Sequence, residues 1–445
     1  MINKVAMDGN NVLVPCKRGK LSFIFIPDHI CELILGKLKP LSKDYFRFGC
    51  VSKQWFSILM QDRQRRRRLH HTNELVPLLA LPSRRHNDGT VKAVVNTLFS
   101  IIDKTTTNGV DLRLTYDVGV DDILNYCGSS YGWLCYFLKS YEIVLCNPFA
   151  AVDNVIRLPP IMRAFDTSPV SKTDKALLRC WQDFISIPRN LGFQYAVRKI
   201  VLSADPRTAL HFLIVAIYTG CDRLAFFNYT TRPTTTTNFP SWTYFDQDDG
   251  WGQFSDVIFH QGLLYACGKR HVFVIKVDTI DYVPVFQVCA KIDMPILNRY
   301  SISPSVSYLT VTTSTKELLL IVKLLHLKSD NSLSLKMFRV FKLAKNQDEE
   351  LWWVNVTNLD GDAVFVGFNH TLSVVASAST GCLPDSIYFT DDCPYISRDV
   401  GPYGSDGPVN MGVVNLNNKS ECKRIRRLPN LEQLPMPPIW ILPMF

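Results

Sequence analysis

The sequence predicts an α+β protein of two parts, a small three-helix module near the N-terminus followed by a large all-β domain of the propeller type. Three observations indicate this architecture. Apolar residues recur at helical spacing near the start, and short β-rich runs recur about every 50 residues further on. The composition is globular, with 47% hydrophobic and 20% charged residues. We expect a disordered tail over residues 1–21, the helical module over 22–62, a basic linker over 63–90 and the β-domain over 91–445.

The first helix of the module is predicted to begin at Pro27, because proline is tolerated in the first turn of a helix. Four apolar residues follow at positions i, i+3, i+4 and i+8: Ile30, Leu33, Ile34 and Leu38. This spacing places their side chains on one stripe of a helix with 3.6 residues per turn. We therefore expect an amphipathic helix whose stripe needs a covering surface.

Two further short helices are predicted from the residues that follow. Ser42 is suited to cap the start of the second helix. The third helix carries apolar residues at i, i+4, i+7 and i+8: Val51, Trp55, Ile58 and Leu59. Three such helices have more apolar faces than they can bury against one another in about 40 residues. A partner protein is the natural cover for the surplus.

At these residues the chain resembles the F-box, the adaptor-binding module of SCF-type ubiquitin ligases. Ile26-Pro27 stands where the family has a Leu-Pro pair, and residues 46–55 match its closing pattern Arg-x-x-x-Val-Cys/Ser-Lys-x-Trp. Ile26 in place of Leu and Gly49 in place of Ala are the two departures. The alternative is a three-helix cap that packs only on the chain's own large domain.

The resemblance implies that the module docks on a Skp-type adaptor and, through it, joins a cullin. The surface that it would bury against the adaptor consists of six residues at the start and along one side of the first helix: Ile26, Pro27, Ile30, Leu33, Ile34 and Leu38.

The positive charge of the chain is concentrated near its start. Residues 1–90 contain 16 Lys and Arg against 7 Asp and Glu, and the remainder is balanced. The densest run consists of Arg63, Arg65, Arg66, Arg67 and Arg68. Such a run fits a solvated helix end, a nuclear-import signal or a nucleic-acid patch. Nucleic acid is the least favoured partner, because no aromatic side chains alternate with the arginines.

Cysteine usage and hydropathy predict an intracellular protein without a metal site or cofactor. The thirteen cysteines lack Cys-x-x-Cys spacing, so we expect reduced thiols, with Cys127 and Cys135 acting as small core residues. No apolar stretch reaches the ~18 residues of a membrane span. The first residues lack a basic-then-apolar signal design. The expected location is the nucleus, the cytoplasm or both.

The β-domain is predicted from short apolar runs between turn residues. Five such runs are residues 132–136, 210–215, 262–266, 317–321 and 363–367. Taking Leu213, Leu264, Leu319 and Phe365 as centres gives a loose period of about 50 residues, which is typical of propeller blades. A large β-sandwich or barrel is the alternative.

Residues 75–445 are similar to the plant F-box-associated KIB-type β-propeller family. The motifs that carry this resemblance lie in order along the chain: 128–134, 147–149, 156–160, 201–206, 254–266, 338–343, 386–392 and 437–440. Each motif also has a structural explanation. Asn147-Pro148 and Asp205-Pro206 initiate turns, and Asp391-Asp392 is an acceptor pair typical of a turn.

No catalytic motif is present in the sequence. It contains no Gly-rich phosphate loop, no His-Glu-x-x-His helix and no Gly-x-Ser-x-Gly elbow, and His260 fits a turn better than a general base. We expect a non-catalytic substrate receptor of an SCF-type cullin–RING ligase, whose propeller recruits a client protein for ubiquitination. The alternatives are a nuclear protein-binding module outside any ligase and an enzyme built on the propeller.

Overall fold

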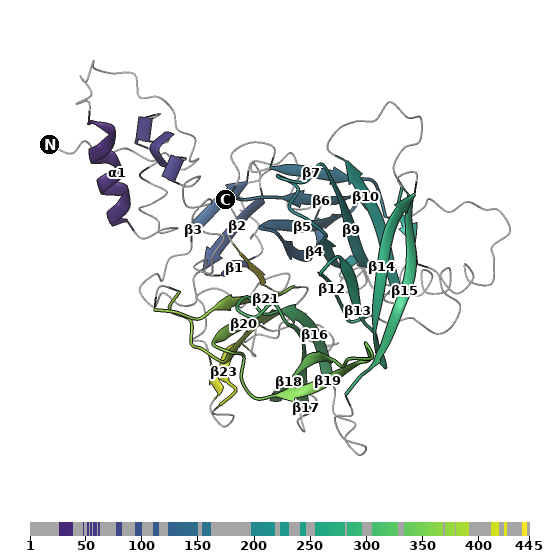
Figure 1. The fold of residues 1–445 in the computed structure, drawn as a ribbon. Coiled ribbons are helices and arrows are strands. Elements are labelled where there is room, and N and C mark those ends of the chain that lie inside the picture. The colour runs from purple at the N-terminus through teal and green to yellow at the C-terminus, as the bar shows by residue number, and fades with distance from the viewer. Residues whose placement is uncertain are drawn as a thin grey trace. The chain divides into compact units, whose positions relative to one another are not determined.

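The structure of the protein is a computed structural model, drawn in Figure 1. The chain divides into two compact units, an N-terminal unit of residues 1–69 and a β-domain of residues 70–445. The residues that the structure describes are 26–38, 48, 51–52, 54–55, 57–59, 61–62, 77–81, 94–99, 110–114, 123–149, 154–161, 197–218, 223–230, 241–245, 254–280, 283–295, 305–327, 333–367, 370–378, 380–390, 411–417, 422–424 and 438–442.

The N-terminal unit contains helix α1 (Asp28–Lys37), and Pro27 is its N-cap. The Pro27 carbonyl accepts hydrogen bonds from the N–H groups of Ile30 and Cys31, at 3.0 and 3.2 Å. Asp28 in the first turn and Lys37 in the last complement the helix dipole. The helix ends at Leu38, which adopts an extended conformation.

A small core holds this unit together. Residues 54–55, 57–59 and 61–62 are helical. The five buried members of the core are Cys31, Leu35, Phe48, Ile58 and Leu59. The rings of Phe48 and Trp55 lie 4.4 Å apart. The predicted three-helix arrangement stays a prediction, because its middle segment around Ser42 is outside the described residues.

The β-domain consists of six sheets in the described part of the chain. The first three sheets, with the strands in hydrogen-bonded order, are β25 (Ile439–Ile441), β1 (Leu78–Leu81), β2 (Val94–Phe99) and β3 (Val110–Leu114); β4 (Ile123–Ser130), β5 (Trp133–Leu138), β6 (Ile143–Cys146) and β7 (Val155–Leu158); and β8 (Val197–Leu202), β9 (His211–Tyr218), β10 (Arg223–Thr230) and β11 (Thr243–Tyr244).

The other three sheets follow along the chain. They are β12 (Asp256–His260), β13 (Leu263–Cys267), β14 (His271–Ile280) and β15 (Val283–Asp293); β16 (Ser305–Val311), β17 (Leu318–Leu327), β18 (Leu333–Lys345) and β19 (Leu351–Val356); and β21 (His370–Val375), β20 (Asp362–Gly367), β22 (Ser386–Phe389), β23 (Gly412–Asn415) and β24 (Cys422–Arg424). All strand pairs are antiparallel except β20 with β22.

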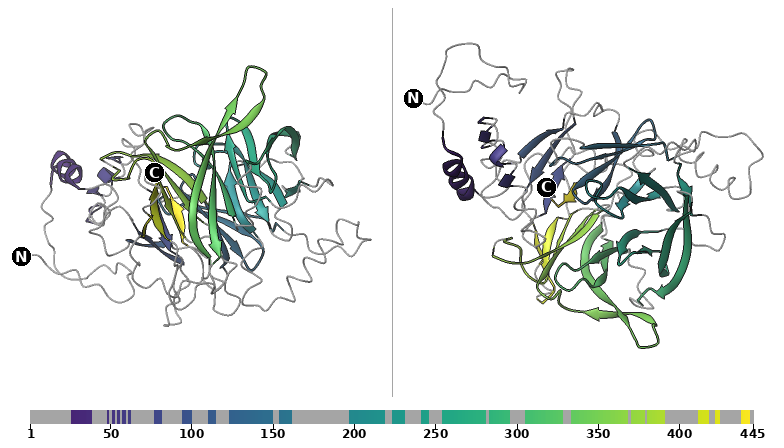
Figure 2. Two further views of the ribbon diagram at one scale, coloured as in Figure 1. Left: turned by 90° about the horizontal axis from the view of Figure 1, so that it is seen from below. Right: turned by 45° about the horizontal axis from the view of Figure 1, so that its top comes forward.

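The six sheets form a closed ring, the architecture of a β-propeller (Figures 1 and 2). The innermost strands β4, β8, β12, β16, β21 and β25 contact one another in this order, and β25 returns to β4. Six buried apolar clusters lie between neighbouring sheets, one for each junction. The core is therefore distributed around the ring, and each sheet is stabilised by its two neighbours. The propeller prediction is confirmed, and the sandwich and barrel alternatives do not describe the domain.

The spacing of about 50 residues in the sequence corresponds to the repeat of the sheets. The predicted runs coincide with β5, β9, β13, β17 and β20, each of which is the second strand from the inner edge of its sheet. These strands are the most apolar ones because a neighbouring strand lies on each side and a neighbouring sheet covers each face.

The ring is closed by the last strand of the chain. β25 pairs antiparallel with β1, with Leu79 opposite Trp440. β1 lies inside residues 63–90, the stretch predicted as a linker, so part of that stretch belongs to the first sheet. The sequence did not indicate this because four apolar residues between two prolines resemble a loop, and β25, one of the two strands that pair with them, lies more than 300 residues away.

Two hairpins of the inner strands use turns that require a left-handed backbone. Tyr131 and Gly132 have φ values of 50° and 77°, and Gln261 and Gly262 have values of 49° and 78°. Two consecutive positive φ angles define a type I′ turn, whose twist matches that of the flanking strands. Glycine at the second position keeps the strain of these turns small.

Candidate functional site

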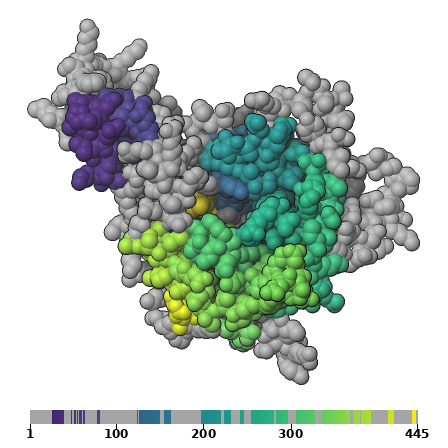
Figure 3. Space-filling model, in the orientation of Figure 1, coloured from purple at the N-terminus to yellow at the C-terminus, as the bar shows by residue number. Residues whose placement is uncertain are grey.

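The outer face of α1 is an exposed apolar surface. Ile30, Leu33 and Ile34 retain 38%, 63% and 38% of their accessible area. The inner face is provided by Cys31 and Leu35, which are fully buried in the unit's core. Figure 3 shows in purple the part of the surface to which α1 contributes. Helices normally turn their apolar residues inward, so three large apolar side chains on the outer face of one short helix make this face a candidate docking surface.

The structure divides the six residues predicted to bind an adaptor into three groups. Ile30, Leu33 and Ile34 lie together on the exposed face of α1. Ile26 and Leu38, just outside the two helix ends, are half-buried and pack against the unit's own core. Pro27 is exposed at the helix start. The open surface is thus centred on the middle of α1.

Gln54 joins the start of α1 to the helical segment that closes the unit. Its amide nitrogen donates hydrogen bonds to the Ile26 carbonyl at 3.1 Å and to the Asp28 carboxylate. In the same segment, the Ser52 hydroxyl accepts the Trp55 N–H at 3.2 Å, as an N-cap does. These contacts fix the position of α1 in the unit. The sequence analysis did not identify Gln54, because no local pattern reveals a contact between residues 26 positions apart.

The arginine run predicted as a possible import signal lies outside the residues that the structure describes. It consists of Arg63, Arg65, Arg66, Arg67 and Arg68.

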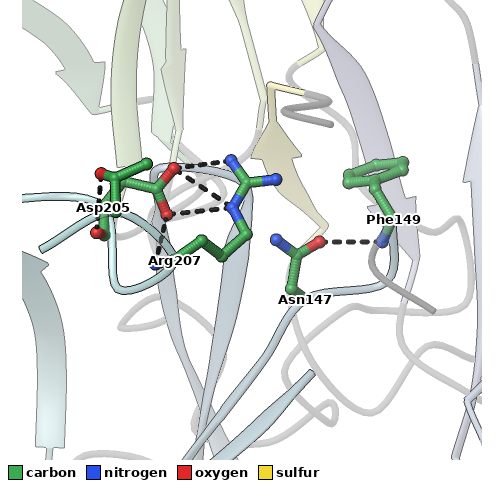
Figure 4. Close-up of polar contacts among 5 residues, drawn as sticks. Asn147, Phe149, Asp205 and Arg207 are labelled. Atoms are coloured by element: carbon green, nitrogen blue, oxygen red, sulfur yellow. Dashed lines mark hydrogen bonds and ion pairs between the residues drawn. The ribbon is translucent and has the colours of Figure 1, made fainter. Parts of the chain in front are cut away.

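Two polar groups at loops of the β-domain stabilise turns (Figure 4). The Arg207 guanidinium donates to the Asp205 carboxylate from Nε at 3.0 Å and from a terminal nitrogen at 2.6 Å. Burial alone would raise the pKa of Asp205, but the hydrogen bonds from Arg207 outweigh it and hold the pKa below its ordinary value. The buried Asn147 side chain accepts the Phe149 N–H at 2.9 Å. Both groups serve the backbone, as expected of turn-initiating Asn-Pro and Asp-Pro pairs.

Buried charges of the β-domain connect neighbouring sheets. Lys199 on β8 forms an ion pair with Asp256 on β12, and the same carboxylate accepts the Leu309 N–H from β16 at 2.7 Å. Asp362 on β20 accepts the Thr313 N–H at 2.5 Å. Each carboxylate thus satisfies groups of the next sheet, which is a structural role. These residues link neighbouring sheets of the ring.

His260, Cys127 and Cys135 lie beside a turn and in buried strands of the β-domain. His260 lies at the end of β12 beside the Gln261-Gly262 turn, and partial burial lowers its pKa. Cys127 and Cys135 are fully buried in β4 and β5, and burial raises the pKa of both thiols. Among the described residues, no group of three or more His, Cys, Asp or Glu is placed to hold a metal ion. None of the helices described here is long and apolar enough to cross a membrane.

Comparison with curated proteins gives a short match. The chain is similar to F-box protein At2g17690 of Arabidopsis thaliana, with 47% identity over 51 residues. This match spans 12% of this chain and 12% of that protein.

Two solved structures show weak likeness. One is the yeast heterotrimeric Nup82-Nup159-Nup116 nucleoporin complex, with 9% identity and a TM-score of 0.24 over 55% of this chain and 70% of that chain. The other is apo AztD from Citrobacter koseri, with 10% identity and a TM-score of 0.26 over 83% of this chain and 98% of that chain. Scores this low do not establish a common fold.

The β-domain gives the most extensive match. The sequence pattern of the KIB1-4 beta-propeller family covers residues 99–414, which is well over half of the chain. This range runs from β3 into β23, so it contains four whole sheets, most of the sheet that ends in β24 and, of the sheet closed by β25, the strand β3. The chain therefore belongs to the KIB1-4 beta-propeller family.

Proposed function

We propose that the protein is the substrate-recognition subunit of an SCF-type cullin–RING ubiquitin ligase. The observation that carries the proposal is the exposed apolar face of α1, formed by Ile30, Leu33 and Ile34, in a unit separate from the propeller. The 47% identity with an F-box protein over 51 residues supports it. In this proposal the N-terminal unit is a three-helix F-box that docks on a Skp-type adaptor, and the adaptor links the chain to a cullin.

The propeller would recruit the client protein. A closed ring of sheets is a rigid body whose loops can be varied without loss of the core. The receptor itself performs no chemical step. It holds a client lysine near the ubiquitin-charged enzyme, so its contribution is proximity and orientation. The proposed location is the nucleus, the cytoplasm or both, where such ligases act.

The alternative is a nuclear protein-binding propeller that joins no ligase. Binding of a purified Skp-type adaptor to the full-length chain separates the two. The proposal predicts that the adaptor co-purifies with wild type, that Ile30→Asp abolishes retention, and that Ile34→Ala weakens it. Burying a carboxylate in an apolar interface is strongly unfavourable, whereas the alanine only removes apolar contact.

Val283→Asp is the matched control, because Val283 is a 53% exposed apolar residue of the β-domain. This variant should retain the adaptor as wild type does. If wild type does not retain the adaptor, or if Ile30→Asp retains it equally well, the ligase proposal is wrong and the non-ligase alternative gains support.

A further inference from the structure

The outer strand β19 differs from the other five outer strands of the described ring. Exposed edge strands normally carry charged residues or proline, or are very short, which prevents pairing with other chains. β3, β7, β15 and β24 each contain a charged residue, and β11 has two residues. β19 has the sequence Leu-Trp-Trp-Val-Asn-Val, with neither a charge nor a proline. Figure 1 shows it at the rim of the ring.

The side chains of residues 351–354 of β19 alternate between the core and the solvent. Leu351 and Trp353 pack against the apolar cluster between the fourth and fifth sheets. Trp352 and Val354, on the opposite face, are 44% and 39% exposed. An edge strand with an anchored inner face and an apolar outer face is preorganised to accept another strand.

The backbone of β19 is open on one side. The Asn346 N–H donates to the Glu350 carbonyl at 3.1 Å. In the antiparallel ladder that follows, the backbone groups of every second residue after Glu350, namely Trp352, Val354 and Val356, therefore face β18. The N–H and C=O groups of Leu351, Trp353 and Asn355 then point away from β18. Within the described residues, no strand pairs with this edge.

The turn at the start of β19 is acidic. Asp348, Glu349 and Glu350 are exposed. Lys345 pairs with Glu349 at 2.8 Å, and the Glu350 carboxylate accepts the neutral Asn346 amide at 2.9 Å. One lysine against three carboxylates gives this end of the edge a negative charge, which favours a ligand with a basic residue here.

We propose that β19 captures an extended segment of the client by strand addition. The segment would run antiparallel to β19, place alternating apolar side chains beside Trp352 and Val354, and end in Lys or Arg next to residues 348–350. This inference rests on the proposed function, because it assumes that the chain recruits a client. A second copy of β19 fits less well, since residues 346–360 contain no Lys or Arg to face the acidic turn.

The test uses a fluorescent probe peptide, acetyl-Thr-Val-Thr-Val-Thr-Val-Lys-Arg, and anisotropy with the full-length chain. Two variants block the edge in different ways. Asn355→Pro removes an N–H that faces outward, which an edge strand tolerates. Val354→Lys places a charge on the exposed face. Val285→Lys is the matched control, because Val285 is a 43% exposed valine on the outer strand β15.

We expect wild type and Val285→Lys to bind the probe equally, and both β19 variants to bind at least about tenfold more weakly. A probe N-methylated at alternate residues should not bind, because it cannot complete the ladder. The inference is wrong if wild type does not bind the probe at up to about 1 mM, or if both β19 variants bind it as wild type does. It is also wrong if wild type is a dimer that Asn355→Pro dissociates. All three variants should retain the adaptor, so a failure here is distinct from a failure of the proposed function.

Discussion

Truncation of Leu33 to alanine should weaken adaptor binding without affecting the fold. Leu33 is 63% exposed in the N-terminal unit, the largest exposed fraction among the apolar residues of α1. Complete burial of a leucine side chain contributes about 1.5–3 kcal/mol. Burial of the remaining two thirds against an adaptor would therefore contribute about 1–2 kcal/mol, and its loss corresponds to an affinity about tenfold lower.

Calorimetric titration of the full-length chain with the purified adaptor measures this effect. Leu210→Ala is the matched control, because Leu210 is a 52% exposed leucine of the β-domain and its truncation should leave the affinity unchanged. The free energy of unfolding of Leu33→Ala should stay within about 0.5 kcal/mol of wild type, as for other exposed positions. An affinity within twofold of wild type would refute the reasoning. So would a loss of more than about 1 kcal/mol of stability, because it would show that Leu33 packs inside the protein.

Three further predictions concern the propeller. Trp440→Ala should lower the free energy of unfolding by about 3–5 kcal/mol, because the buried indole of the closing strand leaves a cavity; a change below about 1 kcal/mol in urea denaturation would contradict the closure by β25. Gly367→Ala should cost about 1–3 kcal/mol, since its Cβ would clash with the buried Thr390 hydroxyl, and an unchanged melting temperature would disprove this clash. Arg207→Met should remove a pH-dependent contribution to stability. The lowered pKa of Asp205 makes this contribution fully present above the ordinary pKa of an aspartate and lost as pH falls through the folded-state pKa. The urea midpoints of the two proteins should therefore converge once the pH is below the folded-state pKa of Asp205; a constant difference at all pH values would argue against the ion pair.

The sequence predicted the repeat of the propeller well and its closure poorly. Strands such as β9 and β17 are continuous apolar runs between turn residues, and such runs are visible in any one repeat. The pairing of β25 with β1 and the ion pair of Lys199 with Asp256 join residues that are distant in the sequence. Neither contact imposes a local pattern, so periodicity and turn residues could not reveal them.

The orientation of α1 was also only partly predictable. The apolar stripe through Ile30, Leu33 and Ile34 was identified, but the helix also carries Cys31 and Leu35, and apolar residues therefore surround much of its circumference. For such a helix, periodicity cannot decide which side faces the core of the N-terminal unit. The contacts with Phe48, Ile58 and Leu59 decide it, and they turn Cys31 and Leu35 inward.

Hydrogen–deuterium exchange of the full-length chain, with and without a Skp-type adaptor, is the most direct test of the central claim that the exposed face of α1 is the docking surface. We predict slower exchange of peptides covering residues 28–37 when the adaptor is added, and unchanged exchange across β8 to β10 of the propeller. Slower exchange in the propeller strands with no change in α1 would contradict the account.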